Sequence, residues 1–149
     1  LWVAPSVVSE FAPLAQEHPE ALVSDAAGKP VVAGEKWYWP PHGKTYNVDP
    51  LKPEGARFLA DFGALMRSYG IVYVKTDFIG SWGGAQRLRQ GMGLLRQALG
   101  PEIVIRPCST ALNTQLGLCN EIGIARDIGN ATGNWQSRVG ASVLSDKPF

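Results

Sequence analysis

A repeated order of segments constrains the fold of this chain more than any other feature: a helical pattern, a glycine and then a β-branched run. Residues 53–69 carry apolar side chains at helical spacing and end at Gly70, and residues 85–99 repeat this order and end at Gly100. Helices that alternate with strands in this way predict parallel strands joined by right-handed crossovers. We therefore expect an α/β fold. The predicted apolar faces consist of Leu59, Phe62, Leu65, Met66 and Tyr69 in the first helix and Leu88, Met92, Leu95 and Leu99 in the second.

Five segments have the composition of strands, and their polar residues gather at the carboxyl ends. The segments are residues 1–5, 45–49, 71–77, 102–108 and 122–128. The polar residues at their ends are Asp49, Lys75, Asp77, Cys108 and Asp127. In a (β/α)8 barrel this end carries the active site. Five strands are too few to close the barrel, so we predict a partial (β/α)8 TIM barrel with two open edges, through which self-association is possible.

Size and charge exclude several classes of partner. A net charge of +1, without a basic run interleaved with aromatic residues, gives no reason to expect nucleic acid or an anionic membrane as partner. No apolar run approaches the roughly 20 residues of a membrane span, so we expect a soluble chain. The 149 residues predict one domain, and the start at Leu1, without an initiator methionine or a signal sequence, indicates a piece of a longer protein. Cys108 and Cys119 form neither a disulfide framework nor a zinc motif, and the compartment stays open.

The strongest candidates for chemistry are two carboxylates that end β-branched or apolar runs. Asp77 closes the run at residues 71–77, two residues after Lys75, and Asp127 closes the last predicted strand. Two carboxylates that face each other across a pocket indicate glycoside hydrolysis. Three other interpretations stay open: Lys75 and Asp77 form an ion pair that caps a strand, Asp127 is a helix cap or surface residue, or Lys75 forms the Schiff base of a barrel aldolase.

Aromatic and polar residues around these strands have two possible roles each. Trp2, like Trp37, Trp39 and Trp82, either stacks on a sugar or packs in the core. Cys108 lines either the pocket or the core, and Asp49, which precedes a proline, is either a sugar ligand or a turn residue. The aromatic segment at residues 37–43 is expected to cover the pocket.

Several short motifs resemble glycoside hydrolase family 36 in the clan of the α-galactosidases. Lys75-Thr76-Asp77 is similar to the Lys-x-Asp motif of the family, and Cys108, Gly117-Leu118 and Asp127 follow in the order of its next two barrel strands. Upstream, the matching pieces are Trp2-Val3-Ala4-Pro5, His18-Pro19-Glu20 and Asn47-Val48-Asp49. The resemblance covers nearly the whole chain and implies strands two to six of the eight-stranded catalytic barrel.

The resemblance implies that the parent protein is a retaining, exo-acting α-glycosidase without a metal or organic cofactor, and we expect little or no turnover from the isolated chain. In this assignment Asp77 is the nucleophile and Asp127 the acid/base, whereas Lys75, Cys108, Trp2 and Asp49 bind an oligosaccharide or α-glycoside substrate. The chain has Gly123 and Asn120 where the family carries arginine and aspartate, which leaves the sugar open. The alternative is a non-catalytic or truncated carbohydrate-binding relative, inactive as an isolated fragment.

Overall fold

A computed structural model of the chain describes residues 1–35, 43–108 and 115–121. Within these ranges, no helix combines the length and the apolar character that crossing a membrane requires. The strands are β1 (Trp2–Val3), β2 (Val7–Ser9), β3 (Val32–Gly34), β4 (Thr45–Asn47), β5 (Tyr73–Thr76) and β6 (Val104–Pro107). The α-helices are α1 (Pro13–Glu17), α2 (Pro53–Ser68) and α3 (Ala85–Leu99), and 3-10 turns span Pro19–Ala21 and Ile79–Trp82.

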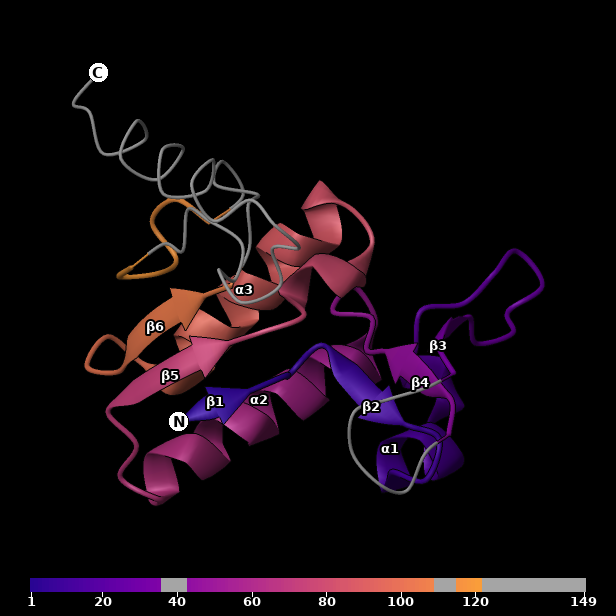
Figure 1. Cartoon of the computed structure of the whole chain (residues 1–149), viewed down its shortest axis with the longest axis horizontal. Coiled ribbons are helices and arrows are strands. Elements are labelled where there is room, and N and C mark those ends of the chain that lie inside the picture. Colours follow the sequence, from indigo (N-terminus) through magenta and orange to yellow (C-terminus); the bar gives the residue numbers. More distant parts are fainter. Residues whose placement is uncertain (36–42, 109–114, 122–149) are drawn as a thin grey trace, which may run out of the picture.

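The main sheet is parallel, with the strand order β1-β5-β6 (Figure 1). Lys75 at its centre is in register with Trp2 on one side and with Arg106 on the other. The parallel direction predicted for the strands at residues 1–5, 71–77 and 102–108 is therefore confirmed. This arrangement shows an α/β fold with three parallel strands.

The parallel strand predicted at residues 45–49 is wrong. β4 instead runs antiparallel between β2 and β3 in a second, small sheet. The place beside β1 is taken by β5, so that β1, α2 and β5 form one crossover and the small sheet is an insertion between β1 and α2. β-propensity describes how well a segment suits a sheet but does not select the partner strand. The sequence therefore predicts the strand correctly but not the strands that pair with it.

Helices α2 and α3 pack on one face of the main sheet and on each other (Figure 1). All four predicted core positions of α3 are buried. In α2, Leu59 and Met66 are buried, whereas Leu65 and Tyr69 are 46% and 69% exposed, so the predicted face is wrong at these two positions. At about 100° per residue, Leu65 lies roughly 120° around the helix from Leu59. Gly55 and Gly63 complete the buried stripe of α2.

Two glycines allow close approach inside this layer. A Cβ at Gly63 would collide with the Ala98 methyl group across the α2–α3 contact, and one at Gly91 would lie 2.6 Å from the Trp82 ring. Trp82 is fully buried, which decides its two possible roles in favour of packing.

Other predicted elements lie outside the described residues. They are the strand at residues 122–128, a helix expected at residues 134–144, and nearly all of the aromatic segment at residues 37–43.

Candidate active site

The face of the main sheet that points away from α2 and α3 carries polar side chains. Along β5, Val74 and Thr76 are buried on the helix side, while Tyr73 and Lys75 alternate with them and are only half-buried. Residues in register on parallel strands project to the same face. Trp2, Lys75 and Arg106 therefore form one row across the sheet.

Asp77 follows β5 directly and is held by both neighbours. Its backbone N–H donates to Val3 O at 2.8 Å, which continues the β1–β5 ladder by one residue. Trp2 Nε1 donates to Asp77 Oδ2 at 3.0 Å, and the backbone N–H of Phe78 donates to Asp77 Oδ1 at 2.8 Å. Each carboxylate oxygen thus has a fixed donor at the carboxyl end of the central strand.

The turn after Asp77 has an unusual backbone. Phe78 has φ of +56°, in the left-handed region that bulky residues rarely occupy. Ser6 is fully buried, and its hydroxyl donates to Phe78 O at 2.8 Å. The rings of Phe78 and Trp2 meet edge to face at 6.2 Å between centroids. Sequence reasoning missed Ser6 and Phe78, because no local pattern marks a left-handed phenylalanine or its distant partner.

Lys75 lies on the polar face beside Trp2 and Arg106, and it is half-buried. Among the described residues, no ion pair joins Lys75 to Asp77. The interpretation of these two residues as a strand-capping ion pair is therefore not supported.

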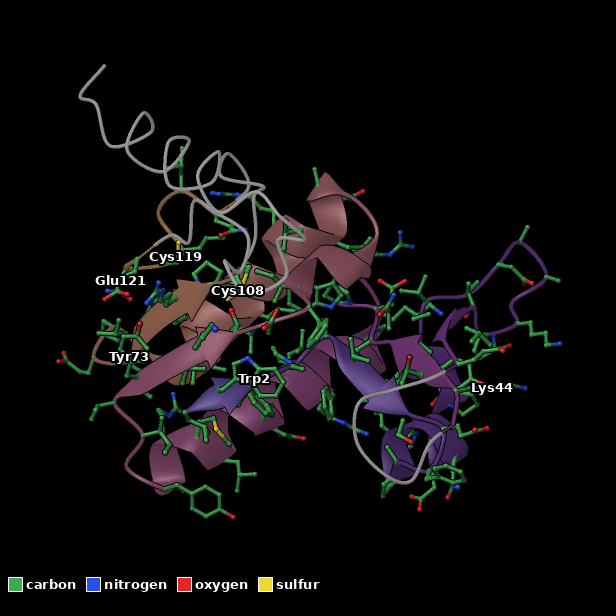
Figure 2. The ribbon with its side chains drawn as sticks, in the orientation of Figure 1. Trp2, Lys44, Tyr73, Cys108, Cys119 and Glu121 are labelled. Carbon is green, nitrogen blue, oxygen red and sulfur yellow. The ribbon has the colours of Figure 1, made fainter. Side chains whose placement is uncertain are left out.

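A second polar group occupies the opposite end of the same face (Figure 2). Tyr73 donates its hydroxyl hydrogen to Glu121 Oε2 at 2.8 Å, and Arg106 Nε lies 3.9 Å from the same oxygen. A side-chain hydrogen bond between Arg106 and Tyr73 raises the pKa of Arg106 above its usual value, and the negative charge of Glu121 raises it further. This group ties the residues after β6 to the amino-terminal half of β5.

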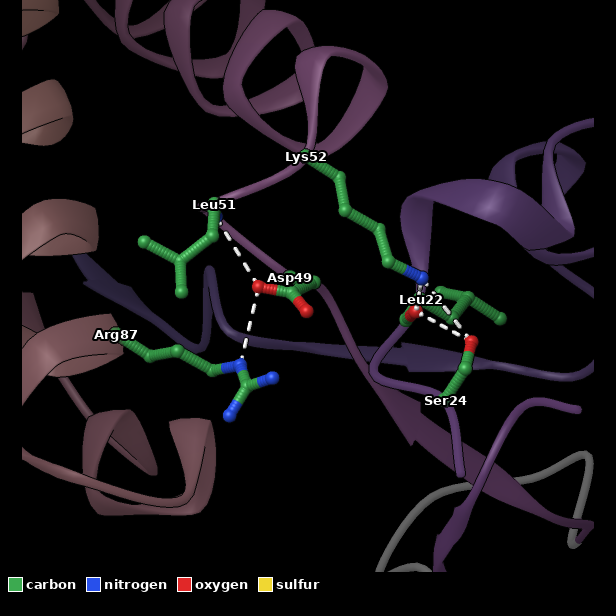
Figure 3. Close-up of polar contacts among 6 residues, drawn as sticks. All are labelled: Leu22, Ser24, Asp49, Leu51, Lys52 and Arg87. Atoms are coloured by element: carbon green, nitrogen blue, oxygen red, sulfur yellow. Dashed lines mark hydrogen bonds and ion pairs between the residues drawn. The ribbon is translucent and has the colours of Figure 1, made fainter. Parts of the chain in front are cut away.

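Asp49 has structural partners. The residue is 3% exposed, and its Oδ1 accepts hydrogen bonds from Arg87 Nε at 3.1 Å and from the Leu51 backbone N–H at 3.1 Å (Figure 3). Nearby, Lys52 Nζ donates to Leu22 O at 2.6 Å and Ser24 Oγ at 3.1 Å. These contacts favour the turn role of Asp49 over the sugar-binding role.

Cys108 comes directly after β6, and its backbone N–H donates to Thr76 O at 2.8 Å. One step beyond the Thr76–Pro107 pair, it is in register beside Asp77. Cys108 is half-buried, as a residue of a pocket wall would be. Asp127, the predicted acid/base, lies outside the described residues.

Arg96 organises the loop at residues 115–121. Its guanidinium donates to Leu118 O, Gly100 O, Ile103 O and Asn120 Oδ1, and partial burial lowers its pKa. Asn120 in turn accepts from Ile105 N–H and donates its own N–H to Ile105 O. These are the groups of β6 that face away from β5, so Asn120 covers part of the open edge.

Asn120, which stands where the family pattern has aspartate, therefore has a structural function in this chain. Next to it, Cys119 is half-buried against the core, and burial raises the pKa of its thiol.

A cavity of about 350 Å³ lies between α1, β2 and the start of α2, away from these residues. Its lining includes apolar side chains (Val8, Leu14 and Phe58) and charged ones (Glu17, Arg57 and Asp61). It contains none of the predicted site residues. The described residues also contain no cluster of three metal-binding side chains.

Comparison with solved structures shows similarity to glycoside hydrolases. TtGalA, an α-galactosidase from Thermus thermophilus solved with stachyose, is 30% identical with a TM-score of 0.72, and the match covers 85% of this chain and 28% of TtGalA. The glycoside hydrolase domain of PelA from Pseudomonas aeruginosa is 13% identical (TM-score 0.58; 81% of this chain and 47% of that one). The GH36 α-galactosidase AgaA from Geobacillus stearothermophilus is 17% identical (TM-score 0.59; 97% and 22%). No protein-family model matches the sequence.

The chain thus has an α-galactosidase-like α/β fold over most of its described length. It spans a little over a quarter of TtGalA, with 28% of that chain covered. The two more distant similarities concern the fold alone.

Proposed function

We propose that this chain contributes part of the active site of a retaining α-galactosidase-like glycoside hydrolase of family 36, with Asp77 as the nucleophile and Asp127 as the acid/base. The observation that carries the proposal is the position of Asp77. It ends the central strand of a parallel sheet with both carboxylate oxygens held by N–H donors. Support comes from TtGalA, which is 30% identical and has been solved with stachyose and with p-nitrophenyl α-D-galactopyranoside.

The proposed chemistry is a double displacement. Asp77 attacks the anomeric carbon while Asp127 gives its proton to the departing glycosidic oxygen, which leaves a glycosyl ester on Asp77. Water then gives a proton to Asp127 and attacks the same carbon, which frees Asp77 and releases the sugar with its configuration retained. The two carboxyl groups of a retaining enzyme lie about 5–5.5 Å apart, and this reaction requires no metal or organic cofactor.

The other predicted site residues divide into substrate-binding and supporting roles. Lys75, on the same face as Asp77, is proposed to donate to sugar hydroxyls. Trp2 is 38% exposed and donates its indole N–H to Asp77, so its ring can contact a sugar while it holds the carboxylate. Cys108 is proposed to form the wall beside Asp77. Asp49 supports the loop that precedes α2.

Replacement of the nucleophile with azide present tests the proposal. Asp77→Ala should abolish hydrolysis of p-nitrophenyl α-D-galactopyranoside, and azide should restore turnover by entering where the carboxylate stood, giving the β-galactosyl azide. Asp61→Ala, which removes an exposed aspartate of α2, is the matched control and should keep the wild-type rate. Undiminished hydrolysis by Asp77→Ala would remove Asp77 from this role, and an α-configured azide product would contradict the retaining mechanism.

The second candidate function is carbohydrate binding without turnover. It is favoured by the small share of TtGalA that the chain covers, 28%, because the rest of an active site can lie in the part that is not matched. Titration calorimetry of the chain with stachyose separates the two candidates. Binding without release of galactose supports this second function, whereas release of galactose that depends on Asp77 supports the first.

A further inference from the structure

We propose that Ser6 is a positioning residue for Asp77, which acts by holding Phe78 in its left-handed conformation. The proposal rests on the nucleophile role of Asp77 and adds a residue outside the row of polar side chains. Ser6 touches no substrate in this scheme, and its effect reaches the carboxylate through one peptide unit.

The first step of the argument is the direction of the Phe78 backbone. The N–H of Phe78 donates to Oδ1 of the preceding Asp77 at 2.8 Å, and Phe78 itself has φ of +56°. A β-branched or bulky residue with positive φ is a true outlier, and it persists only where its surroundings fix it. The conformation therefore needs a partner.

Ser6 supplies that partner from a different part of the chain. Its hydroxyl donates to Phe78 O at 2.8 Å across 72 residues of sequence, and the side chain is fully buried. The backbone oxygen of Ser6 accepts from Val48 N–H at 3.0 Å, so Ser6 is itself fixed to the segment that follows β4. Both ends of the link are thus anchored.

The arrangement also determines the second donor. The Phe78 ring meets the Trp2 ring edge to face, and Trp2 Nε1 donates to the other oxygen of Asp77. If Phe78 leaves the left-handed region, the 77–78 peptide must turn relative to the Phe78 side chain and carbonyl. Either that peptide shifts, and with it the donor of Oδ1, or the Phe78 ring leaves the Trp2 ring. One hydroxyl therefore orients a carboxylate that it does not touch.

Hydrogen exchange of the Phe78 amide and the Trp2 indole N–H in the 149-residue chain tests this directly. In Ser6→Ala, both protons should exchange about tenfold faster, the loss expected when one hydrogen bond no longer holds. Ser9→Ala is the matched control: Ser9 lies three residues away, its hydroxyl accepts from Phe11 N–H, and both signals should stay at their wild-type rates. Unchanged exchange in Ser6→Ala, or an equal change in Ser9→Ala, overturns the proposal.

A double substitution separates support of the conformation from general packing. Glycine adopts positive φ without strain, so in a Phe78→Gly background the amide at position 78 should stay protected and Ser6→Ala should have an effect of less than about twofold. If Ser6→Ala alone does not fold, this background carries the test. A tenfold effect of Ser6→Ala in both backgrounds would show that the hydroxyl does not act through the conformation of Phe78.

The kinetic constants of Ser6→Ala provide a second measurement, which depends on the proposed function. Ser6→Ala should lower kcat for p-nitrophenyl α-D-galactopyranoside about 10- to 100-fold with KM nearly unchanged, as expected for a misplaced reacting group. Absence of hydrolytic activity from the wild-type protein that carries the complete active site would refute the proposed function and leave the exchange result valid. An active wild type with an unaltered Ser6→Ala variant would refute only the positioning role.

Discussion

The same substitution at two glycines should have opposite effects on stability. Gly63 is in α2 and Gly93 is in α3, both in helix interiors. An added Cβ at Gly93 meets no atom within 4 Å, whereas at Gly63 it collides with the Ala98 methyl group and lies 3.0 Å from the Ala98 carbonyl carbon and 3.2 Å from its Cα. Gly93→Ala is therefore a measure of helix propensity alone, and Gly63→Ala adds the cost of the collision.

The magnitudes follow from the contact distances. Replacing glycine by alanine in a helix interior gains about 1 kcal/mol, which Gly93→Ala should show nearly in full. Carbon atoms pack best at about 3.5–4.0 Å, and the atoms that Gly63→Ala would meet are backbone and a methyl group without rotamers, so α2 and α3 must separate. Overpacking costs about 1–3 kcal/mol of stability. Because α2 and α3 would also lose contacts along their length, we expect the cost at Gly63 to lie near the upper end of this range. We expect Gly63→Ala to be about 2 kcal/mol less stable than wild type, which puts it about 3 kcal/mol below Gly93→Ala.

Urea unfolding followed by circular dichroism measures both variants against wild type. The slope of the transition should be unchanged, because neither substitution alters the surface that unfolding exposes. Adding Ala98→Gly to Gly63→Ala removes the colliding methyl group and should recover part of the loss. If Gly63→Ala is as stable as Gly93→Ala, the close approach of α2 and α3 is refuted.

Three further substitutions test other parts of the fold. Arg96→Met removes a partly buried guanidinium with four acceptors and should cost about 2–4 kcal/mol in urea unfolding and speed proteolysis at residues 115–121, whereas Arg67→Met, at an exposed site, should not. Phe78→Gly should be more stable than Phe78→Ala by about 1–2 kcal/mol in thermal unfolding, because only alanine retains the left-handed strain; equal stabilities would contradict that strain. Burial raises the pKa of Cys119 in the folded state, so its contribution to stability is complete below the unfolded thiol pKa and is lost as pH rises through the raised folded value. Urea midpoints should thus fall at alkaline pH in the wild type and fall less in Cys119→Ala.

The elements that the sequence predicted correctly are those with a strong local period. Helix α3 is buried at all four expected positions, and the glycine stops at Gly70 and Gly100 both have positive φ. The parallel pairing of three strands follows from the alternation of helix and strand. These features depend on neighbours in sequence, which periodicity and turn chemistry describe well.

The features that were missed depend on residues far apart in sequence. β4 was identified as a strand, but its antiparallel partners were not, and Leu65 was assigned to a face of α2 that it does not occupy. The sequence indicates Asp77 through its position at the charged end of a β-branched strand, but only the structure shows its donors, Trp2 Nε1 and Phe78 N–H. No sequence pattern identifies a left-handed Phe78. Phenylalanine disfavours this conformation, and tertiary contacts impose it here.

The insertion between β1 and α2 helps to explain how the Trp2 indole N–H, 75 residues from Asp77 in sequence, reaches its carboxylate. Val48 N–H donates to Ser6 O, and Asp49 N–H donates to Ala21 O, so the insertion closes on itself and brings the end of β1 close to the start of α2. The cost of loop closure rises only slowly with length and is offset here by the small sheet's own hydrogen bonds and by its apolar cluster of Val8, Leu22 and Val48. β1 can then pair with β5 as in a short crossover, which sets Trp2 and Ser6 beside Asp77 and Phe78. The small sheet, which contains no proposed catalytic residue, is therefore part of what orients the carboxylate.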